Sequence, residues 1–469
     1  MTRIVVIGAG ISGLSTAFAI ELLAGKAGLE VETRVVEKLD RTGGKIHSIR
    51  DQGYLCEWGP NGFLDNKPMT LELCARLQID GQLLRSNDNA RKRFIYSGKT
   101  LHRLPENGPS FLKSPLISWP GKLRLAGEIL VPKRSDGVDE TLADFGRRRL
   151  GAEALDKLIA PMVSGIFAGD PETMSVRSCF PKIHSLEQEH GGLIRAMIKL
   201  AGKKRAEVKQ GKVVASAAGP GGILTSFSEG IQELSDGTAG ALARGVRTEA
   251  TVTRIEKKLD GYLLQLEDGG QLEAELVVSA APAYAAAAML DGLDSGAAEL
   301  LRQIPYATMN VVCFGYQSDK ITHDLNGFGY LNAKSEGCNT LGTLWDSSIF
   351  PHRAPEGQVL LRSMMGGGTN PGAIDLSEDE VKARTMDDLK QIMGIAAEPD
   401  FVRIFRHRKA IPQYVVGHAR RLRELDQRME RHPGLLLTGN AFGGVGLNDC
   451  VNSSNLVAER IVELLKKRQ

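Results

Sequence analysis

The sequence lacks the residue patterns that metal centres, disulfide scaffolds and nucleophilic active sites require. Its six cysteines include no C-x-x-C pair, which is typical of unpaired thiols in a reducing compartment. Its nine histidines include no H-x-x-x-H or H-E-x-x-H spacing, so no metal site is predicted. Ser12 lies in a glycine turn with no evident base beside it. We therefore expect a bound cofactor, rather than a protein nucleophile, to perform the chemistry.

Strong net charge and long apolar runs are also missing. The 59 basic and 56 acidic side chains leave a formal net charge of +3, so no overall field favours nucleic acid. No stretch of about twenty uninterrupted apolar residues occurs, so no membrane-spanning helix is predicted. The apolar run 4–20 contains a glycine turn and is closed by Glu21, which argues against a signal peptide. A cytoplasmic protein is expected.

The first residues carry a dinucleotide-binding pattern. A short apolar run, 4–7, leads into Gly8, Gly10 and Gly13, spaced G-x-G-x-x-G, and a helical pattern follows. A strand, a glycine turn and a helix in this order aim the free N–H groups of the helix start at a pyrophosphate. Glycine turns also arise for packing alone, so the pattern needs support from the neighbouring sequence.

That support follows at the end of a second apolar run, 31–36. Glu37 lies 24 positions after Gly13, close to where an acidic residue reaches the 2′-hydroxyl of an adenosine ribose. Residues 41–45 then combine a second glycine pair with two cations, which suits close passage of the backbone by phosphate and ribitol. The second glycine pair favours FAD over NAD as the cofactor.

Three later segments also contain glycines and other small residues beside predicted strands or turns. Residues 58–62, WGPNG, predict a turn cluster that is either a plain loop or a source of backbone donors to an isoalloxazine ring. Residues 276–282 predict a buried strand with a small-residue end. Residues 434–440 predict a strand, and a glycine loop and a helix follow at 443–450 and 451–467. The end of the sequence thus repeats the order strand, glycine loop and helix that is predicted at its beginning.

The length of 469 residues indicates about two or three domains. Helices are predicted at 116–130, 142–150, 152–163 and 193–201, and a β-meander at 248–272. We predict an α/β fold in three parts. These are a Rossmann-like FAD-binding domain from residues 1–88, 207–283 and 431–469, a mixed-sheet substrate domain from 89–109 and 284–430, and a helical insertion at 110–206.

The entry to the helical insertion has an unusual composition. Residues 110–134 interleave apolar side chains, Trp119 among them, with lysine and arginine. A helix packed on its own core explains such a mixture. A surface that dips into a membrane interface is the alternative, because cations beside an amphipathic, Trp-bearing segment fit it. The insertion is expected to line the route to the substrate or to make a peripheral contact with the cytoplasmic face of a membrane.

These motifs together resemble the FAD-dependent amine oxidase and phytoene desaturase superfamily. The resemblance rests on GAGISG, Glu37, residues 41–45, GPNG and the terminal TGNAFGGVGLNDCVNSS. Within the superfamily, further stretches are similar to the protoporphyrinogen oxidase family, namely residues 92–96 with 102–105, 163–170 with 175–181, 327–331 and 411–418. The resemblance covers nearly the whole chain and implies an FAD-binding domain of the GR2 type.

The resemblance also implies which residues contact FAD. Most lie in the glycine turns already described, and a few fall on strands. The implied set is Gly8, Gly10, Ile11, Ser12, Gly13, Glu37, Lys38, Arg41, Gly43, Gly44, Lys45, Gly59, Pro60, Asn61, Gly62, Val252, Ser279, Ala280, His407, Gly439, Asn440, Gly446, Leu447 and Val451. His407 is a departure, because many bacterial members carry Trp at this position close to the flavin.

On the substrate side, the family's propionate-holding arginine falls on Arg93 and its macrocycle-packing glycine on Gly165. The clamp across the ring falls on Phe328 and Leu331, and a methionine over the substrate falls on Met364. A hydride transfer to flavin from a large ring needs an apolar pocket and a cation at its rim. Without the resemblance, the same residues are explained as core, turn and surface positions.

The resemblance implies the six-electron oxidation of protoporphyrinogen IX to protoporphyrin IX, with oxygen, or a quinone in anaerobic life, reoxidising the flavin. Coproporphyrinogen III is the nearest alternative substrate. An amine oxidase would require an aromatic cage facing the flavin, which the sequence does not reveal. A flavoprotein that carries a tetrapyrrole without turnover is a further alternative. A homodimer is compatible with the sequence but not specified by it.

Overall fold

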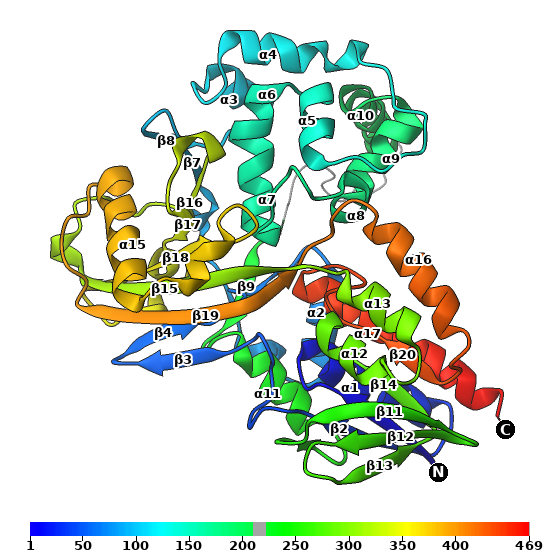
Figure 1. Ribbon diagram of the computed structural model, residues 1–469. Helices are drawn as coiled ribbons and strands as arrows, with labels where there is room; N and C mark the ends of the chain where they lie inside the picture. Colours follow the sequence, from blue (N-terminus) through cyan, green and yellow to red (C-terminus); the bar gives the residue numbers. More distant parts are fainter. Residues whose placement is uncertain (210–221, 469) are drawn as a thin grey trace.

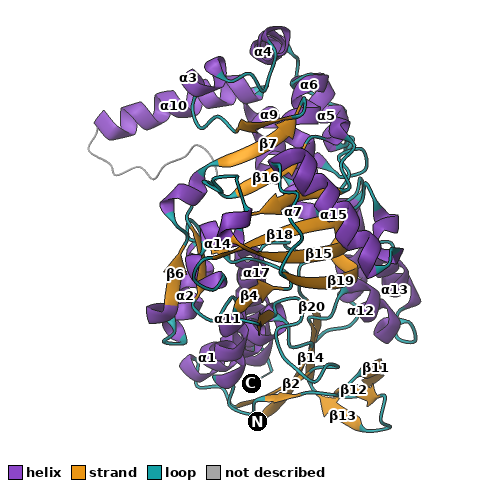
Figure 2. Cartoon of the chain, turned by 90° about the vertical axis from the view of Figure 1, so that its left-hand side faces the viewer, coloured by secondary structure: helices purple, strands orange, loops and turns teal. Residues whose placement is uncertain are grey.

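The computed structural model describes residues 1–209 and 222–468. Residues 210–221, within the predicted segment 207–283, lie outside the described residues. So does Gln469, at the end of the predicted segment 431–469. The helical insertion lies at one end of the molecule and both termini lie at the other (Figure 1). The strands of a large mixed sheet lie between the two ends (Figure 2).

Near the termini lies a five-stranded parallel sheet of order β10-β2-β1-β14-β20. Its strands come from three distant segments: β1 Thr2–Ile7, β2 Val31–Val36, β10 Val246–Arg247, β14 Leu276–Ser279 and β20 Leu435–Leu437. Each of the three segments predicted to build the FAD domain therefore contributes to one sheet. Because parallel strands point the same way, the loops after β1, β2, β14 and β20 meet at one edge.

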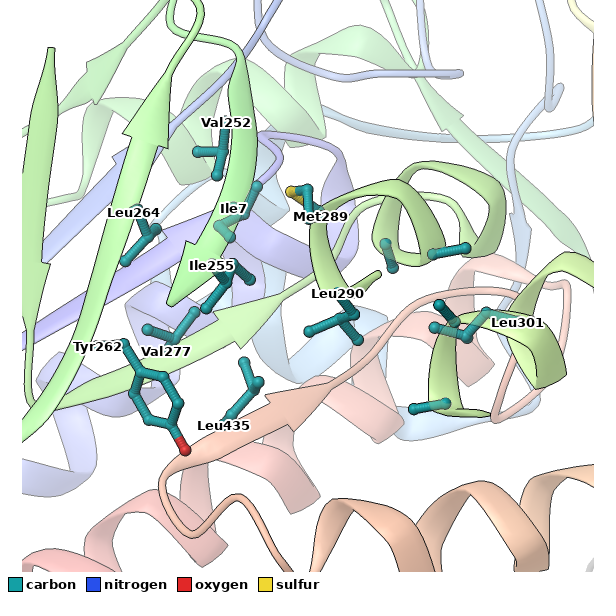
Figure 3. Close-up of a cluster of buried hydrophobic side chains, with 14 of the residues drawn as sticks. Ile7, Val252, Ile255, Tyr262, Leu264, Val277, Met289, Leu290, Leu301 and Leu435 are labelled. Carbon is teal, nitrogen blue, oxygen red and sulfur yellow. The ribbon is translucent and has the colours of Figure 1, made fainter. Parts of the chain in front are cut away.

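Both faces of this sheet are covered, so β1 reads as a continuous apolar run. Ile4 and Val6 pack with α1 (Ile11–Lys26) and α17 (Leu447–Lys466). Val5 and Ile7 pack on the opposite face with an antiparallel three-stranded sheet and with two helices (Figure 3). These are β11 Val252–Lys258, β12 Gly261–Leu266, β13 Gln271–Ala274, α12 Ala283–Leu290 and α13 Ser295–Arg302. The predicted β-meander is thus confirmed.

The large sheet has the order β19-β15-β18-β17-β16-β7-β8. Its strands are β7 Arg93–Ser97, β8 Thr100–Arg103, β15 Tyr306–Gln317, β16 Gly329–Asn332, β17 Thr340–Leu344, β18 Gln358–Gly366 and β19 Phe401–Pro412. The β16–β7 pair is parallel and the other pairs are antiparallel, as a mixed sheet requires. Helix α15 (Glu378–Met393) packs on one face through Val381, Leu389 and Met393. The opposite face is left for the site.

The helical insertion is held together by a fully buried cation. Arg149 is 0% exposed and pairs with Glu128 and Glu187, which are themselves buried. Its guanidinium also donates to the carbonyls of Val131 and Gly191. The insertion comprises α3 Gly108–Lys113, α4 Trp119–Ala126, α5 Leu142–Arg149, α6 Ala152–Ala154, α7 Ala160–Phe167, α8 Val176–Cys179, α9 Pro181–His190 and α10 Leu193–Lys209.

Several short elements connect these parts. The strands are β3 Ser48–Asp51, β4 Tyr54–Glu57, β5 Phe63–Leu64, β6 Leu83–Arg85 and β9 Leu224–Phe227, and the helices are α2 Pro68–Arg76, α11 Gln232–Gly240, α14 Asp346–Ile349 and α16 His418–Met429. Strands β5, β9 and β6 form one small sheet, so residues before and after the insertion meet again.

Four predicted helices have clearly different bounds in the structure. The helix predicted at 193–201 extends to Lys209 as α10. The helix predicted at 116–130 begins at Trp119, because the Ser118 hydroxyl caps it by accepting from the Gly121 N–H. The helix predicted at 152–163 contains a π-helical turn, Leu155–Ile159, just before Pro161, which has no N–H to donate. The helix predicted from Val451 begins at Leu447, after the glycine loop. None of the described helices is long and apolar enough to cross a membrane.

Candidate functional site

Two glycine turns lie against each other at the carboxyl edge of the five-stranded sheet. The Gly43 N–H donates to the Ala9 carbonyl at 2.8 Å, and Gly10 and Gly43 form a bridge. Gly10 is the residue before α1, and no side chain caps the helix there. A Cβ on Gly10 would meet nothing nearer than the Gly43 carbonyl oxygen at 4.0 Å. The open space above Gly10 and the free N–H groups of α1 suit a pyrophosphate.

Glu37 is fixed beside the first turn. Its carboxylate accepts from the N–H groups of Ala9 at 2.7 Å and Leu39 at 3.0 Å, and the residue is 6% exposed. A carboxylate has further lone pairs, which remain for a ribose hydroxyl. The segment leading to Val252 runs alongside, because Ala250 donates to the Glu37 carbonyl. Val252 itself is buried in the core, so a contact with the cofactor there would come from its backbone.

Cations surround the second glycine turn. The Arg41 guanidinium lies 4.7 Å over the Trp58 ring and donates to the Gly44 carbonyl. Lys38 and Lys45 are exposed. Desolvation by the surrounding chain lowers the pKa of Lys45, and the charges of Lys38 and Arg41 lower it further. Among the described residues, no carboxylate pairs with the Lys45 ammonium. The Lys45 ammonium therefore has no described carboxylate to pair with, and the phosphates of FAD would supply that charge.

The remaining predicted cofactor residues reach the same edge from β14 and β20. The Ala280 N–H donates to the Ile7 carbonyl, and the Thr438 N–H donates to the Ser279 carbonyl, both at 2.9 Å. The Ser279 hydroxyl is buried without a hydrogen-bond partner in the described part of the chain. After β20, Gly439 and Asn440 open the loop that ends at Gly446, and Leu447 and Val451 begin α17. All of these positions converge on one edge.

The WGPNG turn at 58–62 is anchored by a fully buried ionic network. Arg353 is 0% exposed and donates to the carboxylate of Glu57 at 3.0 Å and to the side-chain oxygen of Asn61. Arg362 donates to the Gly59 carbonyl at 2.9 Å and pairs with Asp346. The network thereby fastens the turn to strand β18 of the large sheet and to helix α14, where Asp346 lies.

This network changes the interpretation of one predicted cofactor residue. Asn61 accepts from Arg353 and donates to the Asp346 carboxylate at 3.2 Å, and it is 9% exposed. Its side chain is committed to the protein, so the prediction that it contacts the flavin holds at most for its backbone. Gly59 is constrained as well, since a Cβ there would lie 2.4 Å from the Lys45 carbonyl oxygen.

His407 is likewise committed to a protein partner. Its Nδ1 accepts from the Trp58 indole N–H at 3.1 Å, and its Nε2–H donates to the Trp58 carbonyl at 3.0 Å. The pair therefore fixes the neutral tautomer. Phe405, on the same strand, stacks on Trp58 with ring centroids 5.9 Å apart. His407 thus positions Trp58. Neither of its ring nitrogens remains free for FAD, to which the family resemblance had assigned this residue.

This pair predicts a pH-dependent stability. Burial, followed by the charges of Lys45 and Arg41, lowers the pKa of His407 to about 4. The unfolded chain takes up this proton near pH 6.5. As the pH falls from about 6.5 to 4, protonation favours the unfolded state and costs about 3 kcal/mol of stability in total. Chemical denaturation at pH 7 and pH 4.5 measures the loss.

His407→Gln is the control for this prediction, because an amide can form both hydrogen bonds to Trp58 without titrating. The variant should lose less stability than the wild type over the same pH range. His418, whose pKa is also lowered to about 4 by burial, keeps part of the dependence in both proteins. An equal loss in wild type and variant would remove His407 as a cause.

The predicted substrate residues lie on one face of the large sheet. In register across the strands, Leu331 of β16 faces Gly342 of β17, and Gly342 faces Met364 of β18. Arg93 of β7 belongs to the same face, two residues before Ile95, which pairs with Leu331. Residues directly opposite each other share a face of the sheet. This is the face opposite α15.

Helix α7 covers part of this face. A Cβ on Gly165 would lie 2.9 Å from Leu331 Cδ1, so the glycine allows α7 to lie close to β16. Leu331 also packs with Ile95 and with Leu116 of the insertion, which supports the alternative that it is a core residue. Phe328, just before β16, is partly buried near Phe350. Packing and substrate contact are therefore compatible roles for these positions.

Like Lys45, Arg93 has no counter-ion among the described residues. Its guanidinium lies 5.2 Å over the Phe328 ring. Burial lowers the pKa of Arg93, and no described carboxylate raises it. No ion pair or hydrogen bond of its side chain occurs within residues 1–209 and 222–468. A partly buried, unpaired guanidinium beside an aromatic ring suits a carboxylate ligand.

Sequence reasoning missed the ionic network that holds the WGPNG turn. Glu57, Asp346, Arg353 and Arg362 lie far apart in the chain and meet only in the folded protein. A signal was available at Arg362, a lone cation inside the apolar run 359–365, VLLRSMM. A charge at such a position is buried and therefore paired. No group of three or more His, Cys, Asp or Glu side chains suited to a metal occurs in the described residues.

Comparison with known proteins agrees with this geometry. The family described as "Flavin containing amine oxidoreductase" matches residues 11–462. The chain belongs to this family. It is a flavin-dependent oxidoreductase, and its cofactor is FAD. The glycine turns, the Lys45 ammonium without a described carboxylate partner and the open space above Gly10 fit the dinucleotide.

Two curated relatives of this flavin oxidoreductase act on porphyrinogens according to their names. Coproporphyrinogen III oxidase of Bacillus subtilis (strain 168) is 32% identical over 464 residues, covering 96% of both chains. The chloroplastic protoporphyrinogen oxidase of Oryza sativa subsp. japonica is 34% identical over 481 residues, covering 99% of this chain and 88% of that protein. A solved protein of Exiguobacterium sp. 255-15, provisionally named a protoporphyrinogen oxidase, superposes with a TM-score of 0.82 at 25% identity, covering 98% and 99%.

Proposed function

We propose that the protein is an oxygen-dependent protoporphyrinogen IX oxidase. The observation that carries the proposal is the unpaired guanidinium of Arg93 at the edge of an apolar sheet face. When bound, FAD supplies the hydride acceptor for three two-electron oxidations, with dioxygen taken to hydrogen peroxide in each round. The protein's part is to hold a large ring in one orientation and to exclude water around it.

The residues of this face have distinct parts in the proposal. Arg93 pairs with one propionate and so orients the macrocycle. Phe328 and Leu331 clamp the ring, Gly165 lets α7 lie close to Leu331, and Met364 contacts the ring from the same face of the sheet. Pyrrole N–H protons leave to water or internally, so no protein base is required. In anaerobic conditions a quinone would take the place of oxygen.

Coproporphyrinogen III is the second candidate substrate. The Bacillus subtilis relative carries that activity in its name and matches over 96% of its length, and a Staphylococcus aureus relative of the same name is 27% identical. The two substrates differ in their carboxylates, because coproporphyrinogen III has four and protoporphyrinogen IX has two on one edge. Their discrimination therefore depends on cations such as Arg93.

Arg93→Ala tests the proposal. A charge-assisted contact to a propionate contributes about 1.5–3 kcal/mol, so we expect KM for protoporphyrinogen IX to rise about ten- to a hundredfold. Coproporphyrinogen III keeps other carboxylate anchors and should suffer less, so the ratio of specificity constants should move toward it. Initial rates on both substrates, with the flavin spectrum followed, measure this change.

Arg91→Ala is the matched control, since Arg91 is exposed and paired with Asp88 at 3.0 Å. It should leave both rates close to those of the wild type. If the wild type oxidises coproporphyrinogen III faster, the second candidate replaces the first. If no porphyrinogen reduces the flavin, the proposed activity is wrong, and an amine substrate or a carrier role becomes the better hypothesis.

We further propose a cytoplasmic protein whose helical insertion touches a membrane surface. Trp119 is 65% exposed, Leu123 72% and Leu130 81%. Trp119 and Leu123 belong to α4, which lies at the end of the molecule opposite the termini (Figure 1). Lys113 and Trp119 line a hollow of this surface. Large apolar side chains flanked by lysine suit the interface of an anionic bilayer. Not every apolar residue of the 110–134 segment belongs to this surface, because Leu116 is buried in the core.

The membrane proposal predicts that the protein cosediments with anionic liposomes. Trp119→Glu combined with Leu123→Glu should abolish this binding, because a charge in the apolar layer is costly. Leu259→Glu is the control, since Leu259 is 97% exposed in the turn between β11 and β12, far from the insertion. Wild-type protein that stays in the supernatant would show that this surface binds no membrane.

A further inference from the structure

The sequence motif at residues 411–418, IPQYVVGH, has no role in the function described above. It follows β19, and its two central side chains are buried, Gln413 at 6% exposure and Tyr414 at 4%. The backbone of Tyr414 is held from the insertion side, because its carbonyl accepts from the Ser175 N–H at 2.8 Å. The motif is therefore a rigid junction rather than a surface loop.

Tyr414 reaches the loop between β20 and α17 from this junction. Its hydroxyl donates to the Asn440 carbonyl and accepts from the Gly444 N–H at 3.1 Å. One phenol thus closes the loop from 440 to 444. Gly439, just before the loop, and Gly444, its last residue, have φ of +122° and +127°. The loop contains Gly443 and Gly444, which give the backbone little stiffness of their own, so a fixed hydrogen-bond partner restricts its conformation.

The phenol is itself immobilised. Its ring stacks on His418 with centroids 4.3 Å apart and an interplanar angle of 11°. Burial raises the pKa of Tyr414, so the hydroxyl keeps its proton as a donor throughout the physiological range. The ring also contacts Phe167 at 5.9 Å. These contacts leave the hydroxyl in one position between its two partners.

Gln413 contacts the end of α7. Its Nε2 donates at 2.8 Å to the carbonyl of Phe167, the last residue of α7. A Cβ on Gly169 would lie 2.9 Å from Gln413 Oε1, so the chain beyond α7 packs tightly on this side chain. Gln413 therefore holds the helix that carries Gly165, whereas its neighbour Tyr414 holds the glycine loop that precedes α17.

We propose that Tyr414 and Gln413 are positioning residues that together set the spacing between the flavin and the substrate. Tyr414 fixes the loop that presents backbone groups to the flavin, and Gln413 fixes the end of α7 over the substrate face. The inference rests on the proposed function for the identity of the substrate, but its flavin part depends only on bound FAD. Separate substitutions of the two neighbours should therefore have separable effects.

Tyr414→Phe in the FAD-loaded protein should change the visible circular dichroism and the midpoint potential of the flavin. We expect kcat to fall about three- to tenfold, as the loss of one hydrogen bond allows, with KM for the porphyrinogen unchanged. Gln413→Leu should do the reverse, raising KM by a similar factor and leaving the flavin spectrum as in the wild type.

Tyr262→Phe is the matched control. Tyr262 is also buried, and its hydroxyl donates to the Pro433 carbonyl at 3.0 Å, away from the site. It should lower the melting temperature as much as Tyr414→Phe and leave flavin and kinetics unchanged. An unaltered flavin in Tyr414→Phe, or the same spectral change in Tyr262→Phe, would overturn the proposal.

A measurement on the wild-type protein covers the case in which a variant does not fold. Hydrogen exchange of the FAD-loaded protein should show the Gly444 amide protected about tenfold or more relative to an open loop. An unprotected Gly444 amide would contradict the hydrogen bond to Tyr414. Because the spectral and exchange readouts need no porphyrinogen, they remain decisive if the substrate proves to be a different one.

Discussion

Gly10→Val should yield a folded protein that retains no FAD after purification. The site above Gly10 is open in the protein, since the nearest atom to a new Cβ is 4.0 Å away. Gly10 also has φ of −72°, which a valine can adopt. The branched side chain would instead occupy the space through which the pyrophosphate approaches the start of α1. The absorbance of bound flavin, with circular dichroism as the measure of folding, gives the result.

Gly25→Val is the control for this expectation. Gly25 lies in the same helix, and a Cβ there has nothing within 4 Å, so the variant should stay yellow. Gly13→Val is a poorer test, because its Cβ would lie 1.9 Å from the Gly8 carbonyl oxygen and disrupt the packing of α1 on β1. A Gly10→Val protein with a full complement of FAD would refute the assignment of this turn.

Arg353→Met should destabilise the protein by about 3–5 kcal/mol, the usual cost of breaking a buried ion pair from one side. The substitution keeps much of the volume but leaves Glu57, which is 0% exposed, without its cation. Burial raises the pKa of Glu57, and the charge of Arg353 lowers it. Removing Arg353 therefore favours a neutral or displaced Glu57 side chain. Chemical denaturation followed by tryptophan fluorescence measures the change, because Trp58 adjoins Glu57 in the chain.

Arg302→Met provides the contrast, because Arg302 and Asp291 form a pair whose side chains are 45% and 55% exposed. Exposed pairs contribute at most about 1 kcal/mol, so this variant should differ little from the wild type. Adding Glu57→Gln to Arg353→Met should recover part of the loss, since both buried charges are then removed. Equal stability of the two single variants would show that the network contributes nothing beyond an exposed pair.

Much of the fold could be predicted because its signals are local. The strand, turn and helix around Gly8 and Gly13, the acid at Glu37 and the meander at 248–272 each follow from a few consecutive residues. The long strands β15 and β19 were not predicted. Their pairing partners are distant in sequence, and neither strand shows a clear alternation of apolar and polar residues. The start of α17 was misjudged for a related reason, since a glycine-rich stretch can be loop or helix cap.

The sequence by itself determined the cofactor class, because a dinucleotide is recognised by backbone N–H groups whose exposure requires glycines at fixed spacing. Only the tertiary structure decided which polar side chains are free to bind. Asn61 and His407 are hydrogen-bonded to Arg353 and Trp58, whereas Arg93 has no ion-pair partner among the described residues. The physical reason is that a buried polar group takes the partner that folding brings to it, and that partner lies hundreds of residues away in the chain.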